Sequence, residues 1–325
     1  MKVLLIGSYP PPLGGVGVFV KRYRHELEGA GHAVDVIDPA RFAKRELYLE
    51  LYRATGRRYD LISLNFPSFH MMMLLLARGR AGRTEVWDHN WRVLEEWNPL
   101  RRGLYELFLR RCRELVLVAP HIKDYYLAHG VELPAHTRVR HAFLPPPPEE
   151  EESIIATYPA DVLGFVRDSR PLVVANAFRV VLRDGVDLYG LDMCVRLVAG
   201  LKETYPNVGL LFALADVGEP SYFERIGGEV SARGLGRNVH FMTGQRELWP
   251  LFKRADLMVR PTLSDGYALS VAEALHFGCP VVASDAAERP PGATLFATRD
   301  GEDFLRKCRA VLAADDSAAR PRGVE

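Results

Sequence analysis

The stretch SDGYALSVAEALHFGCPVVASD, residues 264–285, decides the fold, because it predicts a loop, a short amphipathic helix, a stop and a buried strand. The helix is predicted over about residues 269–277. Gly278 and Pro280 end it, since glycine suits a helix C-terminus and proline cannot continue the helix. The β-branched pair that follows favours a strand. The segment therefore predicts a helix-to-strand step of a parallel sheet.

Two carboxylates of this segment are predicted to lie at the two ends of one nucleotide-sized site. Asp265 is predicted in the loop before the helix, and Glu273 in its second turn, because a helix rises about 1.5 Å per residue. The first turn carries unpaired N–H groups, so the amides of Gly266, Tyr267 and Ala268 are candidates for holding a phosphate. In an ordinary β-α-β unit the same acids would be only a helix-start residue and part of a solvated face. The pattern alone leaves both interpretations open.

The segment resembles the C-terminal signature of the retaining glycosyltransferases of family 4, which have the GT-B fold and two glutamates separated by seven residues. The resemblance implies that the first acid meets sugar hydroxyls of a nucleotide-sugar donor and the second meets ribose hydroxyls. Asp265 replaces the first glutamate and is one methylene shorter, whereas Glu273 matches the second. The implied reaction is transfer of the sugar from a nucleotide-diphosphate sugar with retention.

Length and composition favour two domains without a membrane anchor. The chain has 325 residues, of which 48% are hydrophobic and 26% are charged, which is enough for two domains of about 150 residues each. A net charge of +1 gives no reason to expect nucleic acid. The four cysteines lack CxxC spacing, so neither a zinc site nor a disulfide framework is indicated. The apolar run 71–77 is too short to cross a membrane. We expect a cytoplasmic protein.

Short apolar runs alternate with helical patterns along both halves of the chain. The predicted strands are 3–7, 33–38, 60–66, 84–90 and 114–120 in the first half, and 171–177, 208–215, 238–244, 256–262 and 279–285 in the second. This alternation predicts an α/β fold, in which two doubly wound, Rossmann-like domains face each other across a cleft.

The stretch LPPPPEEEES, residues 144–153, is interpreted as the interdomain linker, because four prolines and a glutamate run suit neither a central strand nor a core helix. A long surface loop would have the same composition. The predicted domains are an acceptor-side domain, 1–148, and a donor-binding domain, 149–325.

Glycines follow predicted strands in both halves. Gly14 and Gly15 lead from the first strand into a helix and resemble the family's Gly-Gly loop near the donor diphosphate, where backbone amides are accessible. A nicotinamide-binding motif is the competing interpretation. Three prolines lengthen this turn, however, and no GxGxxG follows the strand directly. Gly244 resembles the glycine at the base-binding wall of the family.

Residues that follow strand ends face the ligand crevice in doubly wound folds. His89 lies at the end of the fourth predicted strand, where the family often has a histidine near the transferred sugar. The resemblance implies that it polarises the acceptor hydroxyl or stabilises the departing phosphate. A histidine that only caps a loop through hydrogen bonds would fit the same pattern. A loop-ordering or helix-capping role is likewise open for Asp187 and Asp192.

The segment 175–197 lies where family members have an arginine and then Lys-Gly opening a helix. The implied role of this pair is a clamp on the donor diphosphate, because two cations offset the charge on the leaving group. Tyr189 and Gly190 stand in the Lys-Gly position, so Arg179 or Arg183 has to supply the cation. The resemblance implies no metal ion and no cofactor besides the nucleotide-sugar donor.

Basic side chains cluster in the first half. The clusters are Lys21, Arg22, Arg24; Arg78, Arg80, Arg83; Arg101, Arg102; and Arg110, Arg111, Arg113. They are interpreted either as solvated helix faces or as a surface for an anionic acceptor or the anionic membrane that presents a lipid-linked one. Membrane contact would then be peripheral, at the inner face of the plasma membrane.

Three segments, DGY at 265–267, DLYGLDM at 187–193 and HAFLPP at 141–146, resemble bacterial transferases of exopolysaccharide or other surface-glycan synthesis. We therefore expect a metal-independent hexosyltransferase whose partners are a nucleotide sugar and a glycan or lipid-linked acceptor. Two rivals stay open. One is a GT-B sugar-nucleotide 2-epimerase, and the other is a catalytically silent GT-B protein that binds a partner, which the missing lysine and the Asp-for-Glu exchange favour.

Overall fold

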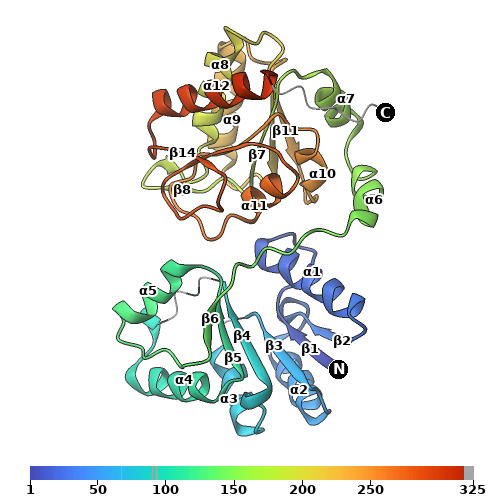
Figure 1. Ribbon diagram of the computed structural model, residues 1–325, viewed down its shortest axis with the longest axis vertical. Coiled ribbons are helices and arrows are strands. Elements are labelled where there is room, and N and C mark those ends of the chain that lie inside the picture. The colour runs from blue at the N-terminus through green and yellow to red at the C-terminus, as the bar shows by residue number, and fades with distance from the viewer. Residues whose placement is uncertain (67, 90, 92–93, 318–325) are drawn as a thin grey trace. The chain divides into compact units, whose positions relative to one another are not determined.

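The computed structural model describes residues 1–66, 68–89, 91 and 94–317. The chain divides into two compact units, Met1–Leu144 and Pro145–Glu325 (Figure 1). Residues 145–148, which the sequence analysis assigned to the first domain, belong to the second unit. They lead into a short 3-10 helix, Pro148–Glu150, that packs against the first helix of that unit.

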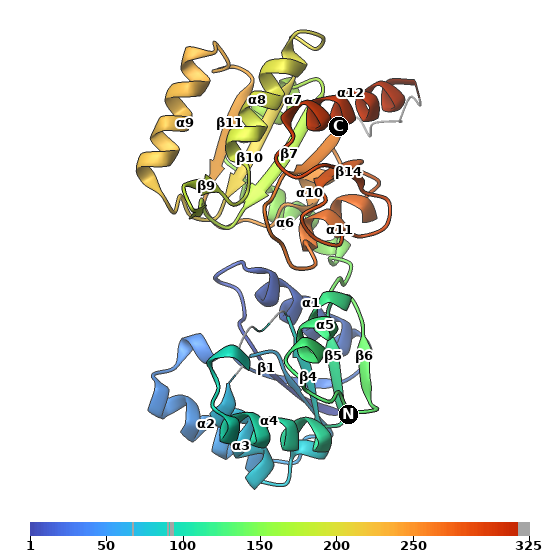
Figure 2. The same ribbon diagram turned by 90° about the vertical axis from the view of Figure 1, so that its left-hand side faces the viewer.

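The first unit is built on one parallel six-stranded sheet with the order β2-β1-β3-β4-β5-β6. Its strands are β1 (Lys2–Ile6), β2 (Ala33–Ile37), β3 (Leu61–Leu64), β4 (Thr84–Asp88), β5 (Glu114–Leu117) and β6 (Thr137–Val139). Its longer helices are α1 (Gly15–Gly29), α2 (Lys44–Gly56), α3 (Phe69–Ala77), α4 (Pro99–Arg111) and α5 (Pro120–Ala128). Because parallel crossovers are right-handed and the strand order reverses after β2, α1 and α2 cover opposite faces (Figure 2).

The second unit has a parallel six-stranded sheet in the order β11-β10-β7-β12-β13-β14. Its strands are β7 (Leu172–Ala177), β10 (Gly209–Leu214), β11 (Val239–Thr243), β12 (Leu257–Arg260), β13 (Val281–Ser284) and β14 (Thr294–Phe296), beside the hairpin β8 (Leu182–Arg183) and β9 (Val186–Asp187). The order matches that of a dinucleotide-binding fold and reverses between β7 and β12.

Helices cover both faces of the second sheet. They are α6 (Glu151–Ile155), α7 (Ala160–Asp168), α8 (Leu191–Lys202), α9 (Pro220–Ala232), α10 (Trp249–Phe252), α11 (Leu269–His276) and α12 (Gly301–Ser317). One apolar cluster joins the sheet to α8, α9 and α12, and a second joins it to α6, α7, α10 and α11. The α/β fold class predicted from the sequence is confirmed.

All ten predicted strands are present, with ends that differ by a few residues. The sequence pattern did not predict β6 and β14, because each is only three residues long and includes exposed side chains. The apolar run 71–77 lies within α3, and Met71 and Met72 are buried in the core. Among the described residues, no helix combines the length and the apolar character that crossing a bilayer requires.

The linker prediction is wrong for the acidic half of the stretch 144–153. Its glutamates form the 3-10 helix Pro148–Glu150 and the start of α6, because acidic side chains are favourable at a helix N-terminus. Ile154 of α6 is buried in the second unit's core, and the Glu151 carboxylate pairs with the Lys253 ammonium of the same unit.

Gly190 tests how tightly the loop before α8 packs against the loop after β12. Its φ is +69°, and an added Cβ would lie 2.4 Å from the Pro261 carbonyl oxygen. Gly185 has a similar φ of +78° but open space around it. We expect Gly185→Ala to lower the free energy of unfolding by about 1–2 kcal/mol, the cost of a left-handed residue, and Gly190→Ala to lower it by at least about 1 kcal/mol more. Urea denaturation measures both, and equal losses would show that the contact with Pro261 is no constraint.

Candidate functional site

The candidate site lies at the carboxyl ends of β7 and β12, where the strand order of the second unit reverses. Loops on the two sides of such a reversal diverge, and ligands of doubly wound folds bind in the crevice that they leave. Asn176 comes from the end of β7, and Arg260 is the last residue of β12. The Arg260 Nη1 donates to the Asn176 carbonyl oxygen at 2.6 Å, so the two strand ends are joined at this point.

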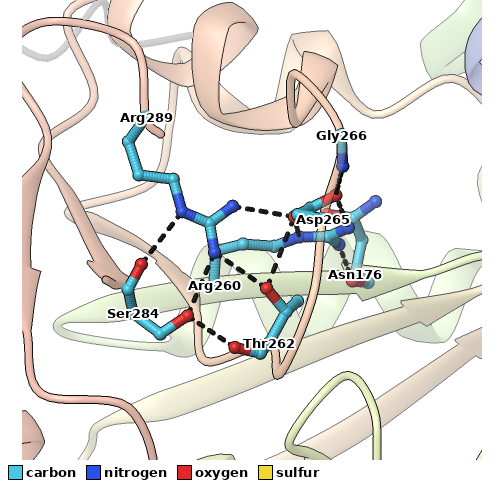
Figure 3. Close-up of polar contacts among 7 residues, drawn as sticks. All are labelled: Asn176, Arg260, Thr262, Asp265, Gly266, Ser284 and Arg289. Carbon is cyan, nitrogen blue, oxygen red and sulfur yellow. Dashed lines mark hydrogen bonds and ion pairs between the residues drawn. The ribbon is translucent and has the colours of Figure 1, made fainter. Parts of the chain in front are cut away.

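Asp265 occupies the centre of the site, in the loop before α11, as predicted (Figure 3). Its Oδ2 accepts from Arg260 Nε at 2.8 Å and from Arg289 Nη1 at 2.8 Å. Its Oδ1 accepts from Arg260 Nη2 at 3.3 Å and from the Gly266 amide at 3.1 Å. Thr262 Oγ1 lies 3.5 Å from Oδ2. The carboxylate is therefore surrounded by donors from its own unit.

Arg289 is anchored more completely than Arg260. It follows β13, and its Nε donates to the Ser284 carbonyl oxygen at 3.0 Å. Its Nη2 donates to Thr262 Oγ1 at 2.8 Å and to Ser284 Oγ at 3.0 Å. Only 1% of its side chain is exposed, against 9% for Arg260. The loops after β12 and β13 are thereby tied together through one guanidinium.

The charges in this network are unequal. Burial alone would raise the pKa of Asp265, but the guanidiniums of Arg260 and Arg289 outweigh it and hold the pKa below its usual range. Burial lowers the pKa of Arg289, and the Asp265 carboxylate opposes that effect. Two guanidiniums around one carboxylate give the three side chains a net charge of +1. The site therefore favours an anionic ligand.

These contacts differ from the role that the sequence analysis assigned to Asp265. The carboxylate anchors two arginines, whereas its contact with a sugar hydroxyl stays a prediction. Neither Arg260 nor Arg289 was among the predicted site residues. The available signal was an arginine at the end of the otherwise apolar run that became β12. An arginine in that position requires a buried counter-ion, and Asp265 lies five residues further on.

The predicted arginines lie elsewhere on the second unit's loops. Arg179 Nη2 pairs with Asp216 Oδ2 at 3.0 Å, with both side chains about half exposed. Arg183 lies in the exposed hairpin strand β8. Tyr189, which stands in the family's lysine position, places its ring 5.1 Å from the Arg260 guanidinium. The cation next to the lysine position is therefore Arg260.

The loop before α8 is organised by an acid. Asp187 Oδ1 accepts from the Tyr189 amide at 2.9 Å and Oδ2 accepts from the Leu191 amide at 2.7 Å, so Asp187 satisfies the N-terminus of α8. Asp192 binds Arg299 through both carboxylate oxygens at 2.9 and 2.8 Å. Both contacts are those of the loop-ordering and capping interpretation.

The start of α11 retains part of the predicted phosphate-binding arrangement. The Gly266 amide donates to Asp265, which uses one of the three predicted donors. Ala268 precedes the first residue of α11 and has a φ of +53°, an uncommon value for alanine and one that clusters at functional sites. Tyr267 lies between these two residues, in the same loop. Glu273 lies in the second turn of α11 and is buried.

The predicted glycines lie at strand-to-helix turns. Gly14 caps α1 and Gly15 begins it, with open space around each. Gly244 follows β11 with a φ of +98°, so an L side chain would be strained there. These positions agree with the predicted loops, whereas their roles in donor binding stay predictions.

His89 follows β4 in the first unit. Its Nε2 lies 3.1 Å from Asn65 Oδ1, and its ring packs edge-on against Phe19 at 5.0 Å between ring centroids. Burial lowers the pKa of His89 to about 3, so the imidazole is neutral near pH 7. A neutral imidazole can exchange a hydrogen bond with a hydroxyl, as the predicted role requires, while the contact with Asn65 also agrees with a loop cap. Asn90, which follows it, lies outside the described residues, as does Pro67 after β3.

Metal-ligand and cysteine chemistry has little support in the residues that are described. The described residues contain no group of three or more His, Cys, Asp or Glu side chains that could hold a metal ion. The four cysteines are buried and form no disulfide in the part of the chain that the structure describes. Several arginines of the basic clusters support the fold. The buried Arg22 donates to the Leu144 carbonyl oxygen at 3.1 Å, Arg80 to Thr55 at 2.9 Å, and Arg83 to Tyr59 at 3.0 Å.

His89→Gln tests the buried neutral imidazole. An unfolded histidine gains a proton below about pH 6.5, whereas folded His89 stays neutral until about pH 3. The stability of the wild type therefore decreases as the pH is lowered through that window. Glutamine can keep the hydrogen bond to Asn65 without titrating. We expect the free energy of unfolding of the variant, relative to that of wild type, to increase as the pH is lowered from 7 to 5. Urea denaturation measures it. His25→Gln, at an exposed position of α1, is the control, and a pH-independent difference for His89→Gln would contradict a neutral buried His89.

Solved structures share this architecture over most of their length. Anabaena HepE in complex with UDP-glucose matches over 97% of this chain and 91% of its own, with a TM-score of 0.65 and 17% identity. Sucrose-phosphate synthase from Thermosynechococcus elongatus matches over 99% and 92%, with a TM-score of 0.62 and 18% identity. At these identities the likeness shows the fold alone, and this chain has the GT-B fold.

The family match falls on the unit that carries the site. Residues 180–294 match the family described as glycosyl transferases group 1. The lipopolysaccharide glucosyltransferase WaaG of Escherichia coli K12 is 29% identical over 93 residues, which are 29% of this chain and 24% of that enzyme's length. The predicted GT-B fold is confirmed, and residues 180–294 of the second unit resemble group 1 glycosyl transferases.

Proposed function

We propose that the protein transfers a hexosyl group from a nucleotide-diphosphate sugar to a glycan or lipid-linked acceptor, with retention, as family 4 enzymes do. The proposal rests on the positively charged network of Arg260, Asp265 and Arg289. This network lies where the strand order of the second unit reverses, inside the matched segment 180–294. A diphosphate is the anion that such a donor would bring there. The named function of WaaG supports a role in bacterial surface polysaccharide synthesis.

In this proposal the second unit holds the donor. Glu273 binds the ribose diol, and the amides of Tyr267 and Ala268 at the start of α11 face the phosphates, where a helix N-terminus favours negative charge. In the first unit, neutral His89 exchanges a hydrogen bond with the acceptor hydroxyl.

Release of free nucleotide from a panel of nucleotide sugars, with and without a glycan acceptor extract, tests the activity. Turnover that depends on the acceptor supports a transferase. Interconversion of the sugar without an acceptor would instead establish an epimerase. Binding without turnover would establish a silent binding protein, which the engagement of the Asp265 carboxylate by two arginines favours.

Glu273→Ala is expected to weaken nucleotide binding at least tenfold, because a charge-assisted hydrogen bond contributes about 1.5–3 kcal/mol. Calorimetric titration measures the dissociation constant, and a melting curve shows whether the fold is retained. Glu229→Ala removes a glutamate from α9 that pairs with Arg233, and it should leave nucleotide affinity unchanged. An unchanged dissociation constant in Glu273→Ala would contradict the ribose assignment.

We propose that turnover needs no metal ion, since guanidiniums and backbone amides can offset the charge of the leaving diphosphate. Turnover after exhaustive dialysis against a chelator should equal that of the untreated protein. Activity that is lost with the chelator and restored by Mg²⁺ would replace this proposal by a metal-assisted one.

We also propose a cytoplasmic protein that meets the anionic inner face of the plasma membrane through Arg110, Arg111 and Arg113, which are exposed near the end of α4. Each basic residue near such a surface contributes about 1 kcal/mol, and salt screens the attraction within about 10 Å. We expect the protein to sediment with anionic vesicles at low salt and to be released at high salt. Charge reversal of the three arginines to glutamate should abolish sedimentation, and binding that survives this change would refute the surface.

A further inference from the structure

The acceptor capacity of Asp265 is already filled within its own unit. A carboxylate offers about four lone-pair sites. Donors from Arg260, Arg289, Thr262 and Gly266 lie at 2.8 to 3.5 Å from its two oxygens (Figure 3). A sugar hydroxyl would have to displace one of these donors, and two of the four residues are charged. The position of Asp265 in the sequence thus marks the site, but its contacts are those of a residue that holds the guanidiniums of Arg260 and Arg289 in place.

The two arginines around Asp265 differ in what they have left to offer. A guanidinium has five N–H donors. Arg289 uses four of them on Asp265, Thr262 and Ser284, and its side chain is 1% exposed. Arg260 uses three in the contacts that the structure describes, and 9% of its side chain is exposed. One N–H on each of its terminal nitrogens remains for a ligand.

Arg260 also has the position that a phosphate-binding group needs. It ends β12, directly beside β7 at the reversal of strand order, and the Tyr189 ring lies 5.1 Å from its guanidinium. Tyr189 stands where the sequence pattern expects a lysine. A planar guanidinium held on one side by a carboxylate is oriented before a ligand arrives, which lowers the entropic cost of binding.

An independent observation at the same strand ends points to a ligand. The Asn176 Oδ1 atom is buried and has no hydrogen-bond partner among the described residues. Asn176 lies next to Arg260, because Arg260 donates to the Asn176 carbonyl oxygen at 2.6 Å. A buried acceptor without a donor costs free energy, and a hydroxyl of a bound sugar would supply that donor. Together with the net charge of +1 in the network, this describes a site for a group that is both anionic and hydroxylated.

We propose that Arg260 binds the diphosphate of the donor in place of the missing lysine, and that Asp265 is a positioning residue that orients Arg260. The inference rests on the proposed function and deepens it, because it names the residue that recognises the phosphates. Asn176 accepts from a sugar hydroxyl next to that phosphate.

Arg260→Gln and Arg289→Gln form a matched pair, since each leaves Asp265 with one guanidinium as a counter-ion. The probes are UDP and UMP, ADP and AMP, and GDP and GMP, and the pair that wild type binds most tightly is used throughout. The readout is the diphosphate preference, which is the ratio of the monophosphate to the diphosphate dissociation constant measured by calorimetry. We expect Arg260→Gln to lower this preference at least about tenfold, and Arg289→Gln to lower it by much less, because Arg289 contributes its charge but no contact with the phosphates.

If Arg260 had a purely structural role, Arg260→Gln would weaken the binding of the monophosphate and of the diphosphate equally and leave the preference unchanged. That result would overturn the assignment of Arg260 but not the proposal that the protein binds nucleotides. An equal loss of preference in both variants would also overturn it, because the whole network and not Arg260 would then be responsible. Failure of wild type to bind any of the three diphosphates would overturn the proposed function as well. If Arg260→Gln does not fold, Arg260→Lys decides: it keeps the charge but loses the fork, so the preference should fall about threefold, and an unchanged preference refutes the proposal.

Discussion

The sharing of one buried carboxylate by two guanidiniums is the constraint on which the second unit's site depends. Asp265 joins Arg260, the last residue of β12, to Arg289, which follows β13, and Arg260 in turn donates to the end of β7. A buried charge has to be paired, so none of these loops can move without exposing one. Removing the carboxylate would leave two buried cations next to each other. The arrangement is rigid for this electrostatic reason, and the excess of one positive charge is what makes the site suitable for an anion.

The second unit holds most of the features that bear on function. Its strand order is that of a dinucleotide-binding fold, its switch point holds the charged network, and the family match covers residues 180–294. The first unit offers a neutral histidine, His89, in an aromatic surrounding at the end of β4. Its arginines are divided between structural roles, as for the buried Arg22, and exposed positions such as Arg110. A donor-side chemistry is therefore better supported than an acceptor-side one.

Local patterns were sufficient for most of the fold. Apolar runs of four to six residues between helical stretches identified the central strands, because strands buried on both faces need continuous apolar side chains. The short edge strands β6 and β14 lacked that signal, since their side chains are partly exposed. The glutamates after the prolines were misinterpreted as linker. Their charge suits a helix N-terminus as well as water, and only the burial of Ile154 against the second unit decides between the two.

At the site, the sequence by itself determined position: it placed Asp265 in the loop before α11 and Glu273 in the second helical turn, because helix geometry follows from spacing. It also showed that a lysine is missing at Tyr189. Only the tertiary structure decided which cation lies there. Arg260 is 71 residues from Tyr189 in the chain, and the two meet only because β12 pairs with β7 in parallel. A contact between side chains brought together by sheet pairing has no local periodicity, so no spacing rule predicts it.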